Sequence, residues 1–107
     1  MTDENLQLYE GLFLFNIQAI NGEMSTAIDH LKEILARAEA EVETISKWDE
    51  ARLAYPIRGQ KRGLYLLSYF RVRPIQVANI ERDVNLSELL LRCLIIKAEH
   101  VGDVELE

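Results

Sequence analysis

The pattern of apolar and polar positions in the first forty residues predicts a strand followed by a helix. Residues 9–16 form a short, aromatic-rich run, and a polar turn follows at Asn21-Gly22, which is typical of a strand buried on at least one face. From about Gly22 to Ala40 apolar residues recur every three or four positions with charged residues between them, and this period indicates one amphipathic helix. Asn21 is expected to cap the helix, because a short side-chain oxygen accepts an unpaired backbone N–H of the first turn.

The rest of the chain predicts a hairpin, a second helix and a fourth strand. Residues 42–57 favour β structure with a bend or bulge at Asp49-Glu50, and Pro56, which has no N–H to donate, restricts this strand to a border of the sheet. Residues 58–63 have the composition of a hairpin loop, and residues 64–72 are dense in Leu, Tyr and Phe, as in a third strand. Pro74 suits the start of a helix that ends near Asn85. Residues 89–97 are too apolar for a strand that meets water on both faces.

This order of elements predicts the fold class. Two helices and four strands in the order β-α-β-β-α-β are typical of an α+β, ferredoxin-like sandwich, with a four-stranded antiparallel sheet and both helices on one face. The 107 residues are enough for a single domain, with a folded core over about residues 8–100, a short N-terminal extension and an acidic C-terminal tail. The uncovered sheet face and the border strand are the expected places for a partner.

The charge distribution points to an anion-binding surface. The net charge is −6, but residues 1–50 hold eleven acids against three bases, whereas residues 51–107 hold seven acids against nine bases. Between Arg52 and Ile80 every charged residue is basic. These residues are Arg52, Arg58, Lys61, Arg62, Arg71 and Arg73. Such a run favours contact with phosphates, although arginines that simply decorate solvated strands and loops would give the same pattern.

Most enzyme chemistry is excluded by what the sequence lacks. His30, Cys93 and His100 fall on three separate elements without ligand spacing, so no metal and no cofactor are expected, and His30 is expected to be solvated. There is no phosphate-binding glycine loop and no nucleophile elbow. Cys93 lies in an apolar run, which favours a buried structural thiol in a reducing compartment. The acidic N-terminus and the absence of an apolar run of roughly 18 residues argue against a signal peptide and a membrane span, and favour the cytoplasm.

The third strand resembles the RNA-contacting strand of RNA-recognition motifs only at its start. Arg62-Gly63 matches the opening of that pattern, but leucines stand at both positions where aromatic rings would stack on bases. Contact with RNA would therefore run through arginine and lysine to sugar and phosphate. The apolar residues of the sheet and its border strand then remain for another protein.

Five segments of the chain together resemble one family. They are Tyr9-Glu10, Trp48, residues 52–57, residues 63–65 and residues 91–97. With the Leu-Ala-Tyr-Pro-Ile block of residues 53–57 as the most specific piece, the chain resembles bacterial small ribosomal subunit protein six, the bS6 family, from Leu8 to His100. The resemblance implies a non-enzymatic structural protein of the cytoplasmic ribosome, without a small-molecule substrate. It further implies binding to the central domain of 16S ribosomal RNA together with ribosomal protein bS18.

Charge and resemblance together give the candidate site residues. Tyr9, Arg92 and Lys97 match RNA-facing strand ends of the family, and the basic run adds further candidates. The expected RNA-binding set is Tyr9, Arg52, Arg58, Lys61, Arg62, Arg92 and Lys97. The expected partner-binding set is Trp48, Leu53, Tyr55, Pro56 and Ile57.

Three points stay open here: the source of a missing charge, the role of two aromatic residues, and a second function. Asp49, Glu50 and Ala51 stand where family members often carry Gly and two basic residues, so Arg58, Lys61 and Arg62 are candidates to supply that charge. The alternating positions of Trp48 and Tyr55 also fit ordinary core packing. The other function that the pattern allows is a ferredoxin-like homodimer that binds protein or a small ligand without RNA. An acylphosphatase-type hydrolase is disfavoured, because the loop at residues 16–22 has no arginine.

Overall fold

All the elements that the sequence pattern predicts are present in the computed structural model, which describes residues 6–101. They are β1 (Gln7–Asn16), α1 (Met24–Arg37), β2 (Glu41–Ile57), β3 (Gln60–Val72), the 3-10 turn η2 (Pro74–Gln76), α2 (Val77–Leu86) and β4 (Leu90–Lys97). The loop expected at residues 58–63 is much shorter, because β2 and β3 are joined by a turn at Arg58-Gly59 alone. The expected acidic tail at residues 102–107 lies outside the described residues.

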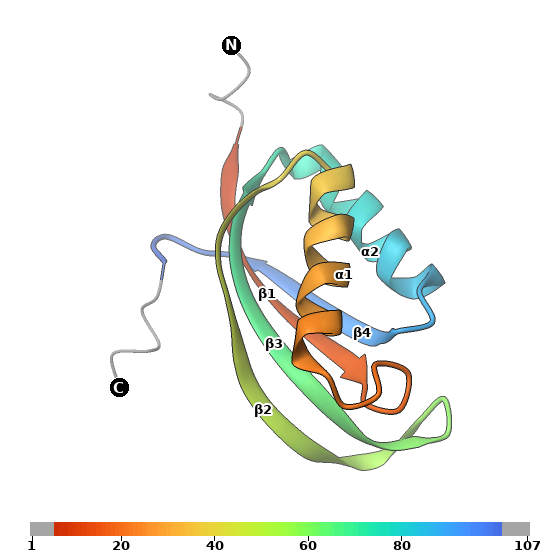
Figure 1. Cartoon of the computed structure of the whole chain (residues 1–107). Helices are drawn as coiled ribbons and strands as arrows, with labels where there is room; N and C mark the ends of the chain where they lie inside the picture. Colours follow the sequence, from red (N-terminus) through yellow and green to blue (C-terminus); the bar gives the residue numbers. More distant parts are fainter. Residues whose placement is uncertain (1–5, 102–107) are drawn as a thin grey trace.

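The strands form one antiparallel sheet in the order β2-β3-β1-β4, with α1 and α2 on the same face (Figure 1). This is the ferredoxin-like arrangement, and the fold prediction is confirmed. β2 lies at the edge, where a proline without an N–H is tolerated, as the position of Pro56 requires. The register of β2 shifts between Lys47 and Asp49, directly before the bend or bulge that the sequence predicts at Asp49-Glu50.

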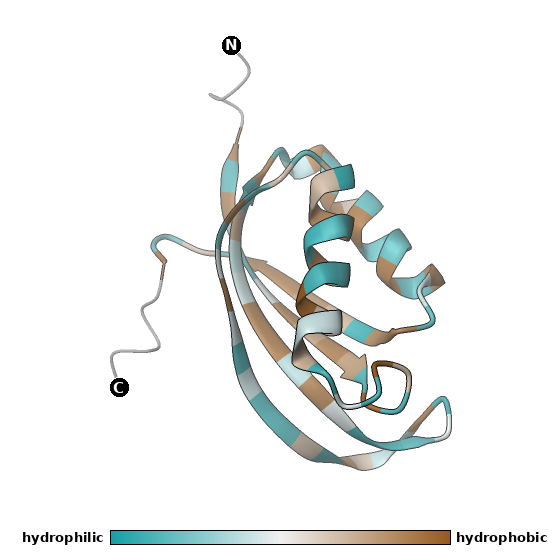
Figure 2. Cartoon of the chain, in the orientation of Figure 1, coloured by the Kyte–Doolittle hydropathy of each residue, from teal (hydrophilic) through white to brown (hydrophobic). Residues whose placement is uncertain are grey.

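The main core lies between the helices and the sheet. Alternate residues of β1 point toward the helices, so that Tyr9, Phe13 and Phe15 join Phe70 of β3 in one cluster. Figure 2 shows the corresponding hydrophobic positions as brown segments along the strands and helices. Gly11 occupies the remaining position of this row, because a Cβ there would lie 2.6 Å from the Phe13 ring and 2.9 Å from the Phe70 ring. The glycine therefore allows two aromatic rings to meet over the strand.

The loop before α1 differs from the expectation. Glu23 is the N-cap residue of α1 and makes no side-chain capping bond, so the capping role expected of Asn21 is wrong. Asn21 and Gly22 instead have φ values of 56° and 70°, in the left-handed region that Asn and Gly tolerate best. The asparagine that organises this loop is Asn16, whose Oδ1 accepts hydrogen bonds from the backbone N–H groups of Gln18 at 3.0 Å and Ala19 at 3.2 Å.

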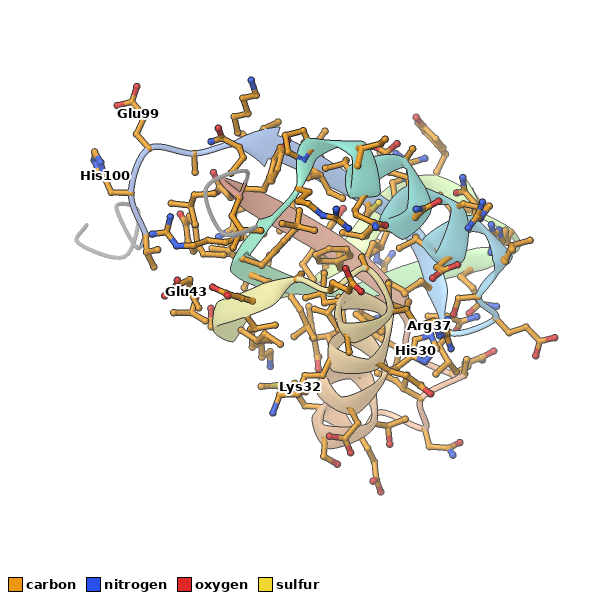
Figure 3. The ribbon with its side chains drawn as sticks, turned by 90° about the horizontal axis from the view of Figure 1, so that it is seen from above. His30, Lys32, Arg37, Glu43, Glu99 and His100 are labelled. Atoms are coloured by element: carbon orange, nitrogen blue, oxygen red, sulfur yellow. The ribbon has the colours of Figure 1, made fainter. Side chains whose placement is uncertain are left out.

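His30 is half-buried rather than solvated, which corrects a second expectation. Its Nε2 lies 2.8 Å from Oγ of Ser87, and that hydroxyl oxygen also accepts a hydrogen bond from the backbone N–H of Leu89. His30 and Arg37 lie on the side of α1 that faces α2, where Arg37 pairs with Asp83 (Figure 3). These contacts fasten α1 to α2 and to the turn before β4.

The His30 contact predicts a pH-dependent stability. Burial lowers the pKa of His30 below its ordinary value of 6.5, an effect that the carboxylate of Glu33 opposes and Arg37 adds to. Well above pH 6.5 the histidine is neutral in both the folded and the unfolded chain, so His30 adds no pH dependence to the free energy of unfolding there. As the pH falls through 6.5, the unfolded chain binds the proton first, and the folded state loses stability until the folded pKa is passed. We expect the urea midpoint to fall between pH 7.5 and pH 5.5, and to fall less in His30→Gln. An equal fall in the variant would mean that other groups cause it.

Candidate nucleic-acid interface and partner face

The β2–β3 hairpin extends beyond the rest of the sheet. β1 pairs with residues 63–72 of β3, so residues 52–62 project past the end of β1; we call them the hairpin arm (Figure 1). At its tip Arg58 and Gly59 have φ values of 51° and 78°, as a two-residue type I′ hairpin turn requires. Glycine adopts this conformation without strain, whereas an L-residue such as Arg58 costs about 1–2 kcal/mol there.

The hairpin arm carries only positive charge. Its charged residues are Arg52, Arg58, Lys61 and Arg62, without a carboxylate among them. Arg52 lies directly opposite Arg62 in the β2–β3 register, and like charges in that position destabilise a strand pair. Neither arginine forms an ion pair with any residue of the described range 6–101. A bound anion would remove this repulsion, so the hairpin arm is the strongest candidate phosphate-binding surface.

The other two cations of the basic run are already neutralised. Arg71 Nε lies 2.9 Å from a carboxylate oxygen of Glu43, and Arg73 Nη2 lies 3.1 Å from one of Glu39. Both pairs lie at the end of β3 far from the hairpin arm, where Arg71 is within the strand and Arg73 follows it. The structure therefore divides the basic run into a paired group and an unpaired group, which the sequence alone does not distinguish.

The tip of the hairpin arm borders a polar hollow of about 280 Å³. One wall comes from the loop between β1 and α1, and the other from the hairpin arm. The lining residues are Ile17, Gln18, Gly59, Gln60, Lys61 and Arg62. Two amide side chains and two cations face an opening without a carboxylate, which is a suitable chemical setting for a phosphate group.

Arg58 differs from the other cations of the hairpin arm because its side chain donates hydrogen bonds to other parts of the protein. Its Nη1 donates a hydrogen bond of 3.1 Å to the backbone carbonyl of Leu90, and its Nη2 donates one of 3.4 Å to that of Asn85. Asn85 lies near the end of α2 and Leu90 at the start of β4. The guanidinium thus links the hairpin arm to the turn between α2 and β4.

The remaining expected RNA-binding residues lie at two ends of the sheet. Arg92 is exposed near the start of β4, opposite Leu14 and two residues after the carbonyl that Arg58 binds. Lys97 is exposed at the other end of β4, opposite Tyr9. Tyr9 itself is only 6% exposed and its ring lies 6.2 Å from that of Phe70, so its ring serves mainly the core. Arg92 extends the basic end of the molecule, and Lys97 lies apart from it.

The sheet face without helices carries an apolar patch. It contains a hollow of about 160 Å³ lined by Glu10, Leu12, Trp48, Leu67, Leu94 and Ile96. Trp48 is 58% exposed and meets Tyr65 edge to face at a centroid distance of 5.8 Å, so the interpretation of Trp48 as a core residue is wrong. Tyr55 is 66% exposed in the hairpin arm, and the same correction applies to it.

The expected partner-binding residues therefore fall into two parts. Trp48 lies on the open sheet face, whereas Leu53, Tyr55, Pro56 and Ile57 lie in the hairpin arm. Sequence reasoning missed Leu12, Leu67, Leu94 and Ile96, which complete the patch around Trp48. The alternation of residues in β1 indicates a second apolar face that includes Leu12. In β4 the continuous run Leu94-Ile95-Ile96 gives no such indication, because apolar residues point to both sides of the sheet.

No cluster of three or more potential metal ligands occurs within residues 6–101. Burial, with a smaller contribution from Glu81, raises the pKa of the Cys93 thiol to about 11, so this thiol is protonated at neutral pH and a poor nucleophile. Within the same residues, every helix falls short of the length and apolar character needed to cross a bilayer.

Fold and surface together define a ferredoxin-like domain with a basic hairpin arm and an apolar open face. Residues 8–97 match the family described as Ribosomal protein S6, and the chain belongs to this family. It is 32% identical over 96 residues to small ribosomal subunit protein bS6 of Campylobacter jejuni, covering 90% of this chain and 77% of that protein. It is 33% identical over 104 residues to bS6 of Chlamydia caviae, covering 97% and 93%.

Solved structures agree on the fold. The 30S ribosomal protein S6 of Thermotoga maritima superposes with a TM-score of 0.73 at 17% identity, over 87% of this chain and 88% of that one. The C-terminal domain of MgtC from Mycobacterium tuberculosis reaches a TM-score of 0.62 at 12% identity, over 96% and 99%, and shares the fold alone. The family assignment makes the protein a structural constituent of the small ribosomal subunit and not an enzyme.

Proposed function

We propose that this protein binds the central domain of 16S ribosomal RNA together with ribosomal protein bS18. The observation that carries the RNA part is the hairpin arm, in which Arg52 and Arg62 face each other across the two strands with no carboxylate partner among the described residues. Membership of the S6 family supplies the ribosomal context. The rest of the chain is strongly acidic, so RNA would be attracted most strongly to this end of the molecule.

On the RNA side, the contacts are charge-assisted hydrogen bonds to phosphate and sugar. Arg52, Lys61 and Arg62 in the hairpin arm and Arg92 at the start of β4 supply them at one end. Lys97, beside Tyr9, supplies a separate contact at the other end of β4. Such contacts read the shape of the RNA backbone rather than the sequence of its bases, in keeping with leucine side chains where stacking rings would be needed.

On the protein side, bS18 covers exposed apolar surface. The candidates are Trp48 with its neighbours on the open face, and Leu53, Tyr55, Pro56 and Ile57 in the hairpin arm. Leu94 and Ile96 are half or more exposed beside Trp48, and burying such side chains stabilises a complex by the removal of apolar area from water. Aromatic residues with one polar edge, such as Trp48 and Tyr55, are enriched at the centres of protein interfaces.

An assembly experiment tests the proposal. A transcript of the 16S central domain is titrated with the protein in the presence of bS18, and the complex is detected by a gel shift at several KCl concentrations. With about three to five phosphate contacts, the logarithm of the association constant falls against the logarithm of the salt concentration with a slope of roughly −2 to −4.5. Absence of a shift, or an affinity that does not change with salt, would contradict binding through the basic end.

The same protein preparation also distinguishes RNA and bS18 binding from the alternative function, a homodimer that does not bind RNA. The exposed apolar patch around Trp48 is the observation that favours it. Size-exclusion chromatography of the protein alone reports the oligomeric state. Because the chain has one tryptophan, 5-fluorotryptophan at position 48 gives a single ¹⁹F resonance that reports on the patch. We expect this resonance to shift on addition of bS18 and to be independent of protein concentration without it. A stable dimer that ignores both RNA and bS18 would favour the alternative.

A further inference from the structure

Arg58, at the tip of the hairpin arm, is an unusual residue for the first central position of a type I′ turn. Both central positions of a type I′ turn need a positive φ, which Asn-Gly provides with the least strain. The second position is Gly59, but the first is Arg58, at φ 51°. The turn itself gives no reason for an arginine, so its side chain is the feature to explain.

The side chain of Arg58 reaches two carbonyl groups on either side of the turn between α2 and β4. Its Nη1 lies 3.1 Å from the carbonyl oxygen of Leu90, and its Nη2 lies 3.4 Å from that of Asn85. The last carbonyls of a helix have no partner within the helix and carry its partial negative charge, and the last turn of α2 has no basic residue of its own. Of the two acceptors, Asn85 is such a helix-end carbonyl and Leu90 belongs to β4, and a guanidinium with donors in a fixed fork can bind both at once.

These two bonds join the hairpin arm to the body of the protein. Within residues 6–101, they are the side-chain hydrogen bonds that connect residues 52–62 to other elements. Past the end of β1 the arm, residues 52–62, is otherwise a two-stranded ribbon with an irregular register between Arg52 and Ile57. An isolated two-stranded hairpin is marginally stable in water. Without Arg58, the wall of the polar hollow formed by Gly59, Lys61 and Arg62 would not be fixed against the loop at residues 17–18.

We infer that Arg58 is a positioning residue, which fixes the hairpin arm on the α2–β4 turn so that Lys61 and Arg62 are presented to the RNA backbone. Arg58 then contacts protein carbonyls rather than phosphate. The inference rests on the proposed RNA binding, but it makes a separate prediction about the protein alone.

The test uses three variants of the full-length protein. Arg58→Asn keeps the turn, because Asn-Gly is the preferred type I′ pair, and removes the two bonds. Arg58→Lys keeps the charge, but a single ammonium does not present the planar fork. Arg62→Ala removes a proposed phosphate contact and leaves Arg58 in place. Each is examined by amide hydrogen exchange without RNA, and by the salt dependence of binding to the 16S central domain with bS18.

Arg58→Asn and Arg58→Lys are both expected to raise hydrogen exchange in residues 57–62 by about tenfold or more, with the β1–β3 ladder unchanged. Their RNA affinity is expected to fall about tenfold, while the salt slope stays that of the wild type. Arg62→Ala is expected not to raise exchange, since it removes the repulsion with Arg52, and to reduce the salt slope by about 0.7–0.9.

Three results would overturn the inference. Unchanged exchange in both Arg58 variants would show that the bonds do not hold the arm, whatever the RNA does. A salt slope reduced in Arg58→Asn but restored in Arg58→Lys would make Arg58 a phosphate contact. Wild-type RNA affinity in Arg58→Asn, despite raised exchange, would show that positioning does not matter. Failure of the wild-type protein to bind RNA would instead refute the proposed function, and with it the role of Arg58 toward RNA.

Discussion

Replacing Arg52, Lys61 and Arg62 together by alanine is expected to weaken binding to 16S ribosomal RNA by about two to three orders of magnitude at 0.1 M salt. Each phosphate contact releases roughly 0.7–0.9 counterions, so the loss of one contact lowers the association constant about five- to eightfold at this concentration. The triple substitution is also expected to lower the salt slope by about 2–3, since three contacts are lost. Filter binding to the 16S central domain with bS18 present, at four or more KCl concentrations, measures both quantities.

The structure provides a control of equal charge. Arg37, Arg71 and Arg73 pair with Asp83, Glu43 and Glu39, so substituting these three by alanine removes the same formal charge from side chains that are already neutralised. We expect an affinity within a few-fold of the wild type and an unchanged salt slope, because exposed ion pairs of this kind contribute little and no phosphate contact is lost. Equal losses in the two triple variants would mean that net charge alone, and not the hairpin arm, drives binding.

The elements of the fold were predictable because their signals are local. The apolar period of α1, the aromatic run of β1 and the missing N–H of Pro56 each act within a few residues, and they specify a helix, a strand and a sheet edge. The capping role of Asn21 failed for a local reason as well. Asn21 and Asn16 are both suited to loops, and the left-handed φ of Asn21 leaves the hydrogen-bonding role to Asn16.

The sequence predicted which basic residues are candidates for the site, but not which of them lie together in space. The basic run was visible in the sequence, yet the separation of Arg71 and Arg73 from the hairpin arm depends on which glutamates the strand register brings near them. Arg58 meets a carbonyl 32 residues away, and His30 meets a hydroxyl 57 residues away. Such contacts depend on how the elements pack in three dimensions, which the period of apolar residues along one element does not encode.

The open face illustrates the same limit for partner binding. The sequence predicts an uncovered side of the sheet, and Figure 1 shows both helices on the opposite side. Which residues form the patch depends on all four strands, because Leu12 of β1 lies beside Trp48 of β2, Leu67 of β3 and Leu94 of β4. The bulge near Lys47 and Asp49 interrupts the strict alternation of β2 next to Trp48, so the face of that side chain does not follow from counting residues along the strand.

Phe70→Ala is expected to give the largest loss of stability of any substitution considered, about 3–5 kcal/mol. Phe70 lies on the central strand β3 with no exposed surface, and its ring centroid lies 6.2 Å from that of Tyr9 and 6.4 Å from that of Phe13. Alanine leaves a cavity that these rings and the backbone close to Gly11 cannot fill without moving. Since small domains are stable by only about 5–15 kcal/mol, the variant is expected to be close to unfolding at 37 °C.

Urea unfolding followed by far-UV circular dichroism measures this loss as a lower midpoint with an unchanged dependence on urea. Ile75→Ala is the matched control, because this side chain is apolar but 77% exposed, and its removal is expected to change the stability by no more than about 0.5 kcal/mol. The comparison separates burial from hydrophobicity as such. Similar losses in both variants would show that Phe70 does not lie at the centre of the packed layer between the helices and the sheet, and the close aromatic contacts that require glycine at position 11 would then have no basis.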